Sequence, residues 1–551
     1  MSPRWDKVWP LWAPRTIEIE KPASEYVRDW SRWTPERIAL SFYGRDLSYA
    51  ELNNLTDRMA WGLKGLGVKK GDRVAIHMEN CPQFVIAYFG VQRAGGVVVA
   101  VNPMFKGPEL EFELNDSRAE TLVGIDTLYS EVQRVRERTF LKNVILTCAR
   151  DFLPAVPSLA LPEEARHGAP SFPDTIDFLE LIGDSPDDPV CEVIDLKNEL
   201  ALLQYTGGTT GIPKGAMISH YSLSVAALGN MFWYRSREDD VFLGVTPFFH
   251  VMGQTVLMAG PLVAGAKIVV LSRFVPEVVA EAIGRYRCTF WVGATTMMIA
   301  LLNLPDIDQY DFSSLRCVWS GGTTISTELQ ERLKALAPEA VIGEGYGLTE
   351  SFSQGGACTP LYQHKPGFVG IPQIEVEMKI VDRETGIEEL PPNETGEILI
   401  KSPAVMLGYW NRPEETQEML RDGWLHTGDI GSMDEEGYVK FMGRTREMIK
   451  CSGFSVFPTE VEDLLYRHPA VKETAVIGVA DSYRGESPKA FIVLKEEYAG
   501  TTTEEEILAW CKENMATYKR PRYVEFRREL PKTSAGKIHK MALVEEQGKD
   551  A

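Results

Sequence analysis

The sequence predicts an α/β protein with a large N-terminal domain of βαβ-built sheets, a small β-rich subdomain and a small α+β C-terminal domain. Strand-like apolar runs alternate with helical patterns through much of the chain, which is typical of largely parallel sheets. From about Gly367 short strand patterns stand between Gly, Pro and Asn turns, and near Gly443 the pattern shifts again. A chain of 551 residues is also too long for one hydrophobic core.

The N-terminal elements are expected as short strands and helices in alternation. A helical pattern at 82–94 lies between strand-like runs at 73–78 and 96–101, as in a βαβ unit. Further strands are expected at 241–245, 267–271, 288–292 and 315–320. The segment 151–188 is rich in Pro and acidic residues, which predicts an excursion on the surface.

The second part of the chain is predicted to hold smaller units. Short strands are expected at 376–381, 396–400, 475–479 and 489–494. A helix is expected at 504–515, with Thr503 as its N-cap. We therefore predict an N-terminal domain at 1–442 and a C-terminal domain at 447–551, with the boundary between them at 443–446; the length of the second is usual for a domain.

Composition limits the classes of function. The formal net charge of −20 argues against nucleic acid as a partner. The eight cysteines are scattered without a Cys-x-x-Cys pair, which indicates a reduced, cytoplasmic protein without a zinc site. We find no signal-peptide pattern and no run of about 18 apolar residues, so we expect no transmembrane segment. Peripheral contact with the inner face of the membrane stays open, as does a homodimer.

The most informative segment is the loop YTGGTTGIPKG at 205–215, which follows the apolar run 200–203. Glycines let backbone N–H groups approach oxyanions, threonine hydroxyls donate hydrogen bonds and a lysine adds positive charge, so the loop suits a polyphosphate. It is not a Walker A loop, because Lys214 is followed by Gly215. The alternative is a surface turn of small residues. The candidate phosphate ligands are Thr206, Gly207, Gly208, Thr209, Thr210 and Lys214.

Three later motifs carry further candidate groups. In the motif GYGLTE, Tyr346 can stack on a base, Thr349 can donate to a phosphate and Glu350 can supply an oxygen to Mg²⁺. Asp429 suits a ribose diol, because a carboxylate can accept from both hydroxyls. Lys537 lies on a Gly-containing loop from which it can reach a neighbouring domain. Each has an alternative interpretation when taken singly. The GYGLTE motif also fits a loop with a buried tyrosine, Asp429 fits a turn residue, and the segment of Lys537 fits a solvated tail.

These motifs occur together and in order along nearly the whole chain. They are LSYAEL at 47–52, RAGG at 93–96, PFFH at 247–250, SGG at 320–322, GYGLTE at 345–350, GEI at 396–398, GYW at 408–410, WLHTGD at 424–429, GR at 443–444 and PKTSAGK at 531–537. The ordered set resembles the adenylate-forming superfamily of acyl-CoA synthetases, nonribosomal-peptide adenylation domains and firefly-type luciferases. Within it the chain most resembles prokaryotic medium- to long-chain fatty acyl-CoA ligases.

The resemblance implies two reactions. A fatty acid carboxylate attacks the α-phosphate of MgATP, giving acyl-AMP and pyrophosphate, and the thiol of CoA then displaces AMP to form a thioester. Adenylation supplies a good leaving group, so catalysis depends on positioning and charge stabilisation. The resemblance implies that the loop from Thr206 to Lys214 holds the β- and γ-phosphates, that Glu350 and Thr206 bind Mg²⁺ and that Thr349 contacts the α-phosphate.

The resemblance also assigns nucleotide-binding and catalytic residues. The expected adenine and ribose ligands are Gly321, Gly322, Tyr346, Asp429 and Arg444. Lys537 is expected to bridge the carboxylate and the α-phosphate oxygens and to neutralise charge as the bond forms. His250 is expected to border the acyl pocket as a gate between the two reactions, although a histidine after two aromatic residues is often simply packed.

A mobile C-terminal domain is a further implication of the resemblance. Its rotation between the two reactions is expected to withdraw Lys537 and to bring Lys450 and Gly453 to the site. Gly453 is expected to line the tunnel for the pantetheine arm of CoA, where a side chain would block the thiol. Arg446 stands at the hinge where Asp or Lys is usual, which leaves the pivot residue open. The basic segment 519–528 is expected to meet CoA phosphates.

The nature of the acid is the least constrained part of the hypothesis. Apolar, methionine-containing segments at 251–262 and 291–302 favour an alkyl substrate, although core packing explains them equally well. The motif PFFHVM offers no aspartate for an amine, so a simple carboxylic acid is expected. Gly293 stands where proline is expected and predicts a more open pocket floor. The alternatives are an aryl-CoA ligase of the benzoate or coumarate type, an acyl-AMP ligase that supplies a carrier protein, and a non-catalytic nucleotide sensor.

Overall fold

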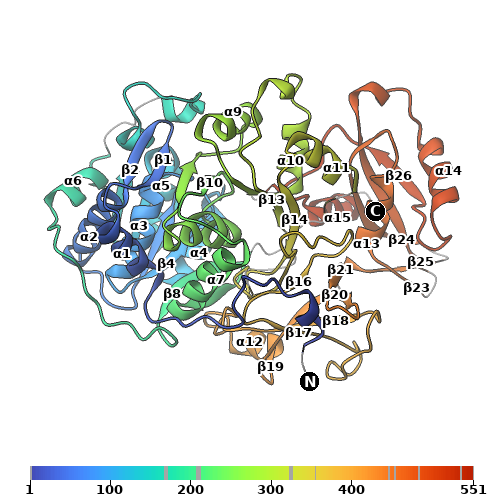
Figure 1. The fold of residues 1–551 in the computed structure, drawn as a ribbon, viewed down its shortest axis with the longest axis horizontal. Helices are drawn as coiled ribbons and strands as arrows, with labels where there is room; N and C mark the ends of the chain where they lie inside the picture. The colour runs from blue at the N-terminus through green and yellow to red at the C-terminus, as the bar shows by residue number, and fades with distance from the viewer. Residues whose placement is uncertain are drawn as a thin grey trace.

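The structure is a computed structural model and shows two large sheets, a β-rich unit and a C-terminal unit (Figure 1). In Figure 1 the C-terminal unit lies at the opposite end of the molecule from helices α2 (Tyr49–Gly65) and α6 (Phe178–Asp184), and the N-terminus lies beside the β-rich unit. The residues that the structure describes are 3–166, 172–206, 213–321, 325, 327–353, 355–444, 447–451, 454–481, 484–533 and 536–549.

The first large sheet has seven strands in the order β7-β6-β5-β3-β4-β8-β9. Neighbouring strands are parallel except β8 and β9, which form an antiparallel pair. The strands are β3 (Arg73–His77), β4 (Val97–Ala100), β5 (Thr121–Ile125), β6 (Asn143–Thr147), β7 (Ile176–Asp177), β8 (Leu200–Tyr205) and β9 (Gly215–Ser219). The loop predicted to bind phosphate therefore connects two strands at one edge of this sheet.

The second large sheet has nine strands in the order β16-β15-β14-β13-β12-β10-β11-β1-β2. Its centre is parallel, and β2, β15 and β16 are antiparallel additions at the two edges. The strands are β1 (Ile38–Phe42), β2 (Arg45–Ser48), β10 (Val241–Gly244), β11 (Lys267–Val270), β12 (Phe290–Gly293), β13 (Cys317–Gly321), β14 (Val341–Tyr346), β15 (Ala357–Cys358) and β16 (Ile371–Pro372). The largely parallel sheets expected from the sequence are confirmed.

Two smaller sheets follow in the chain. The β-rich unit is an antiparallel sheet of β17 (Glu377–Val381), β18 (Gly396–Lys401), β19 (Leu420–Arg421), β20 (Trp424–Met433) and β21 (Val439–Arg444). The C-terminal sheet contains β22 (Ile449–Cys451), β23 (Phe454–Val456), β24 (Val471–Asp481), β25 (Gly485–Leu494) and β26 (Tyr523–Phe526), in which only the β25–β26 pair is parallel.

The helices cover these sheets and enclose the cores. The remaining α-helices are α1 (Ala23–Trp33), α3 (Pro82–Arg93), α4 (Gly107–Ser117), α5 (Tyr129–Val135), α7 (His220–Trp233), α8 (Gly260–Val263), α9 (Pro276–Tyr286), α10 (Thr295–Leu302), α11 (Thr327–Leu336), α12 (Pro413–Met419), α13 (Pro458–Leu465), α14 (Glu504–Asn514) and α15 (Lys540–Lys549). Helix α3 is buried along its whole length, including Gln83, Gln92 and Arg93, as expected for a helix inside a large core. One core extends across both large sheets and the β-rich unit, whereas the C-terminal sheet has small cores of its own.

Local signals account for most of these elements, with one correction. Thr503 caps α14 as expected, since its hydroxyl accepts from the N–H of Glu506. The prediction of a surface excursion at 151–188 was wrong for its last third, because β7 pairs with β6 and α6 packs on α2. Phe178 is fully buried and Ile182 nearly so. Their spacing of four residues makes one apolar helix face, which the surrounding Pro and acidic residues obscure in the sequence.

Candidate active site

The base of the predicted phosphate loop is closed by hydrogen bonds. Strands β8 and β9 end at Tyr205 and begin at Gly215. The N–H of Thr206 donates to the carbonyl of Lys214 at 3.0 Å, and the N–H of Lys214 donates to Oγ1 of Thr206 at 3.3 Å. The two ends of the loop are thus held together. The other four predicted phosphate ligands lie outside the described residues, and they are Gly207, Gly208, Thr209 and Thr210.

Tyr409 connects this loop to the predicted Mg²⁺ ligand. The segment around Tyr409 lies along β9, with the N–H of Trp410 donating to the carbonyl of Gly215 at 2.8 Å. Nζ of Lys214 lies 5.1 Å from the centre of the Tyr409 ring, within cation–π range. The Tyr409 hydroxyl donates to Oε1 of Glu350 at 2.6 Å. No role for Tyr409 in the motif GYW was predicted from the sequence. No sequence spacing predicts its contact with Glu350, which lies 59 positions away.

The predicted adenine site lies at the carboxyl ends of β13 and β14. These neighbouring parallel strands bring Gly321 opposite Gly345, next to Tyr346. The Tyr346 ring is largely buried beside Phe441, at 5.6 Å between ring centres. A Cβ at Gly321 would lie only 2.4 Å from Sδ of Met252, so a side chain here would have to displace the end of the Met252 side chain. Gly322 lies outside the described residues.

Asp429 and Arg444 lie opposite each other on neighbouring strands of the β-rich sheet. They are register partners on β20 and β21, and Nε of Arg444 lies 3.4 Å from Oδ1 of Asp429. The hydroxyl of Tyr346 donates to Oδ2 of Asp429 at 2.8 Å. Burial raises the pKa of Asp429 to about 6, against the opposing influence of the Arg444 guanidinium and this hydrogen bond. The carboxylate is therefore charged at neutral pH.

Lys537 reaches this group of residues from the C-terminal unit. It lines a small cavity that His250, Gly321 and Tyr346 also line. The pKa of Lys537 is lowered to about 8, chiefly by burial and also by the nearby Arg444, against the raising influence of Asp429. Burial, with the nearby Lys537, lowers the pKa of His250 to about 3, so His250 is neutral. Its Nδ1 accepts from the N–H of Met252 at 3.3 Å.

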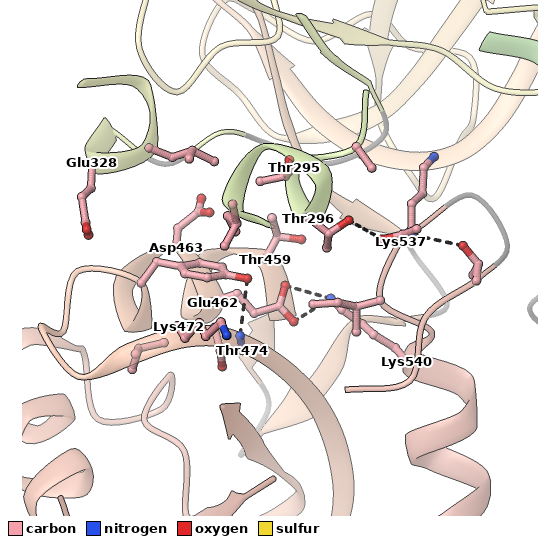
Figure 2. A pocket seen from close by; sticks show the side chains of 18 of the residues that line it. Thr295, Thr296, Glu328, Thr459, Glu462, Asp463, Lys472, Thr474, Lys537 and Lys540 are labelled. Carbon is pink, nitrogen blue, oxygen red and sulfur yellow. Dashed lines mark hydrogen bonds and ion pairs between the residues drawn. The ribbon is translucent and has the colours of Figure 1, made fainter. Parts of the chain in front are cut away.

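Two cavities adjoin Lys537. The small cavity has a volume of about 50 Å³ and a mixed wall, in which Val251, Val256 and Trp319 lie beside polar residues such as Asn230, Ser320 and Gln373. Gly293 is not among the residues that line this cavity, and a Cβ there would lie 3.3 Å from both Sδ of Met297 and Nε1 of Trp291. The effect of Gly293 on an acyl pocket therefore stays a prediction. The larger cavity, of about 300 Å³, lies between α10 and α11 on one side and the C-terminal unit on the other (Figure 2).

The remaining predicted residues are spread between these features. Thr349 is partly buried beside Glu350, and its carbonyl accepts from the N–H of Phe352 at 3.1 Å. Lys450 is exposed on β22 and lines neither cavity. Gly453 and Arg446 lie outside the described residues, so the predicted hinge is only partly described.

No helix in the described ranges combines the length and the apolar character that a membrane crossing requires.

The structure thus joins two large, mainly parallel sheets and a β-rich unit to a C-terminal unit whose Lys537 lines a cavity shared with the large domain. The chain belongs to the AMP-binding enzyme family. Residues 27–410 match the AMP-binding enzyme family, and residues 460–537 match its C-terminal domain.

Relatives and solved structures extend over nearly the whole chain. It is 36% identical to a long-chain-fatty-acid–CoA ligase of Bacillus subtilis over 553 residues, covering 98% of each chain. It is 32% identical to 4-coumarate–CoA ligase 1 of Petroselinum crispum, covering 90% of this chain and 88% of that one. The crystal structure of the anthranilate CoA ligase AuaEII in complex with anthranoyl-AMP is similar with a TM-score of 0.86 and 29% identity, covering 97% of this chain and 98% of that one.

Two structures of one relative, MatB from Rhodopseudomonas palustris, bear on the arrangement of the chain. Both are 28% identical to it and cover 96% of this chain and 99% of that one. The TM-score is 0.84 for the ATP-bound structure and 0.74 for the apo structure. The arrangement described above is therefore more similar to that of the ATP-bound relative.

Proposed function

We propose that the protein is an ATP-dependent fatty acid–CoA ligase. In the first reaction a carboxylate oxygen bonds to the α-phosphorus of ATP and pyrophosphate leaves, giving acyl-AMP. In the second the sulfur of CoA bonds to the acyl carbon, AMP leaves and the thiol proton is released. The observation that carries the proposal is Lys537, held partly buried in one cavity with Tyr346 and His250 and close to the Asp429–Arg444 pair.

In the first reaction different residues bind different parts of ATP. Lys214 and Thr206 hold the polyphosphate at the base of their loop, and Thr349 contacts the α-phosphate. The Asp429 carboxylate accepts hydrogen bonds from the ribose hydroxyls, and the Arg444 guanidinium stabilises its negative charge. The Tyr346 ring faces the base. A lysine charge inside a partly desolvated cavity acts strongly on the developing charge at the α-phosphate, and Lys537 supplies it.

Mg²⁺ is the metal that this donor set fits. Glu350 and Thr206 offer a carboxylate and a hydroxyl, and Mg²⁺ is usually held by one or two carboxylates together with substrate phosphates and water. Among the described residues no group of three or more His, Cys, Asp or Glu side chains could hold a metal alone. When bound, Mg²⁺ would neutralise charge on the phosphate oxygens. Tyr409 orients Glu350 for this role through its 2.6 Å hydrogen bond.

In the second reaction CoA is the acceptor. We propose that the C-terminal unit turns, withdraws Lys537 and brings Lys450 and Gly453 to the site. The exposed position of Lys450 in this structure is consistent with its having no part in the first reaction. The basic segment 519–528 is proposed to meet CoA phosphates.

The acid proposed is a fatty acid. No carboxylate stands among the described residues that line the small cavity, so a substrate amine would have no counter-charge there. The volume of about 50 Å³ is far below the roughly 300–1,000 Å³ of a usual ligand pocket, so an alkyl chain enters only when side chains move. Met252 is partly buried at this wall and flexible enough to move. The small volume of the cavity also favours a second candidate, a compact aryl acid, as in the relatives named for 4-coumarate and anthranilate.

Product analysis tests the proposal. With decanoate and ATP alone, the protein is expected to release pyrophosphate and accumulate decanoyl-AMP. Addition of free CoA is expected to convert it to decanoyl-CoA and AMP in equal amounts. Decanoyl-AMP that persists with CoA but reacts with an acyl carrier protein would instead establish the carrier-protein ligase. Nucleotide binding without pyrophosphate release would establish the sensor.

We further propose a cytoplasmic enzyme, for which contact with the inner face of the membrane and assembly as a homodimer are two testable properties. Flotation with phospholipid vesicles and light scattering of the purified protein measure these two properties directly.

A further inference from the structure

The turn that carries Lys537 is shaped by its own hydrogen bonds. The N–H of Thr533 donates to the carbonyl of Lys537 at 2.6 Å, and the N–H of Lys537 donates to Oγ1 of Thr533 at 3.2 Å. Gly536 has a φ of +79°, a conformation that favours glycine, and its N–H donates to the carbonyl of Thr533 at 2.8 Å. These bonds define the shape of the turn, and its position against the large domain requires a contact outside it.

Thr296, in the first turn of α10, makes such a contact. Its Oγ1 donates to the carbonyl of Gly536 at 2.6 Å, and Figure 2 shows this side chain directed at the backbone beside Lys537. A Cβ at Gly536 would lie 3.3 Å from this hydroxyl, so the missing side chain permits the close approach. Threonine is β-branched and has few rotamers, so the direction of its hydroxyl is well defined. The bonded carbonyl belongs to the residue just before Lys537.

A second anchor of the same region lies wholly within the C-terminal unit. Nζ of Lys540, at the start of α15, lies 2.8 and 2.9 Å from the two oxygens of Glu462 on α13 (Figure 2). Glu462 also accepts from the N–H of Val476 on β24 at 2.7 Å. This anchor moves with the C-terminal unit and does not depend on how that unit meets the large domain. The Thr296 bond, in contrast, forms only when the two are closed on each other.

We propose that Thr296 is a positioning residue for Lys537, because its bond to Gly536 sets the turn so that Lys537 enters the cavity beside His250. The inference rests on the proposed function, in which Lys537 serves adenylation and withdraws for thioester formation. A contact made in one of two arrangements affects only the reaction that uses that arrangement. Thr296 therefore supports the first reaction and is dispensable for the second.

Two substitutions test this role in the full-length protein. Thr296→Val keeps the shape and removes the hydroxyl, and Thr296→Ser keeps the hydroxyl. Adenylation is measured as decanoate-dependent ATP–pyrophosphate exchange, and thioester formation is measured from supplied decanoyl-AMP and CoA. Since small displacements of a catalytic group cost up to about a hundredfold in rate, we expect Thr296→Val to lose about ten- to a hundredfold in exchange. Thr296→Ser is expected to restore most of the exchange, and both variants are expected to form the thioester at the wild-type rate.

Lys495→Gln is the matched control, because it also removes a contact between the C-terminal unit and the large domain. Nζ of Lys495 lies 3.6 Å from Oε1 of Glu328 on α11, at a half-exposed position where an ion pair contributes little. We expect exchange by this variant to stay near the wild-type rate.

Three results would overturn the inference: wild-type exchange in Thr296→Val, equal losses in both reactions, or the same loss in Lys495→Gln. Absence of acid-dependent exchange in the wild-type protein, with decanoate, palmitate and benzoate alike, would refute the proposed function and the inference with it. The result that refutes the inference alone is different: the wild-type protein is active, and Thr296→Val is equally active. Melting temperatures of the variants show whether a loss comes from unfolding.

Discussion

Replacement of Asp429 by Asn changes both ends of the pH range in which adenylation is expected. The Asp429 carboxyl, with a pKa of about 6, is charged above that pH and can then accept from both ribose hydroxyls. Lys537, with a pKa of about 8, is charged below that pH and loses its charge as the pH rises. Adenylation by the wild-type protein should therefore be fastest between about pH 6 and pH 8.

The structure gives the direction in which the pH profile of Asp429→Asn shifts and the size of its loss in kcat/KM. In Asp429→Asn the acid limb should disappear, because the amide does not titrate. The alkaline limb should move to lower pH, because the negative charge of Asp429 raises the pKa of Lys537 and is lost. Hydrogen bonds to a charged group contribute about 1.5–3 kcal/mol, so kcat/KM for ATP should fall roughly ten- to a hundredfold at neutral pH.

The assay is kcat/KM for ATP in decanoate-dependent pyrophosphate exchange, measured from about pH 5 to pH 9.5. Tyr346→Phe serves as the control, since it keeps the carboxylate and removes a hydrogen bond that lowers the pKa of Asp429. Its acid limb should persist and move to higher pH. An acid limb that remains in Asp429→Asn, or an alkaline limb that stays in place, would refute this explanation.

Three further substitutions test other parts of the account. Lys537→Ala should abolish pyrophosphate exchange and leave thioester formation from supplied acyl-AMP intact; equal loss of both would contradict the division of labour. Tyr409→Phe leaves Glu350 without its hydrogen bond and should weaken Mg²⁺-dependent ATP binding about tenfold in calorimetry, whereas unchanged binding would mean that Tyr409 does not orient Glu350. Phe178→Ala should destabilise the fold by about 3–5 kcal/mol, seen as a lower melting temperature, because Phe178 is fully buried. An unchanged melting temperature would contradict the burial of Phe178 between α6 and α2.

Local sequence patterns predicted much of the fold and the chemical character of the site. Apolar runs located the strands of the parallel sheets, and Thr503 located the start of α14, because both signals depend on neighbours in sequence. The acid, lysine and aromatic residues of the motifs were recognised by residue type. The structure then brings Lys537, Tyr346 and His250 to one cavity, with Asp429 and Arg444 close by.

Contacts between distant residues could not be predicted in this way. The hydroxyls of Tyr409 and Thr296 bond groups 59 and 240 positions away, and their partners depend on how whole sheets and units meet. The space beside Gly293 could not be predicted either, because the positions of the Met297 and Trp291 side chains next to it depend on packing. The helix at α6 was missed, because this short segment, in which Phe178 and Ile182 are buried, is flanked by Pro and acidic residues typical of loops.

The most direct test of the central claim is the choice of acid. Rates of CoA thioester formation are compared for decanoate, palmitate, benzoate and 4-coumarate at equal, subsaturating concentrations, so that they report kcat/KM. A fatty acid–CoA ligase should use decanoate or palmitate at least about tenfold better than either aryl acid, which corresponds to one or two buried methylene groups of differential binding. A large preference for benzoate or 4-coumarate would contradict the fatty-acid assignment and leave only the shared adenylate-forming chemistry.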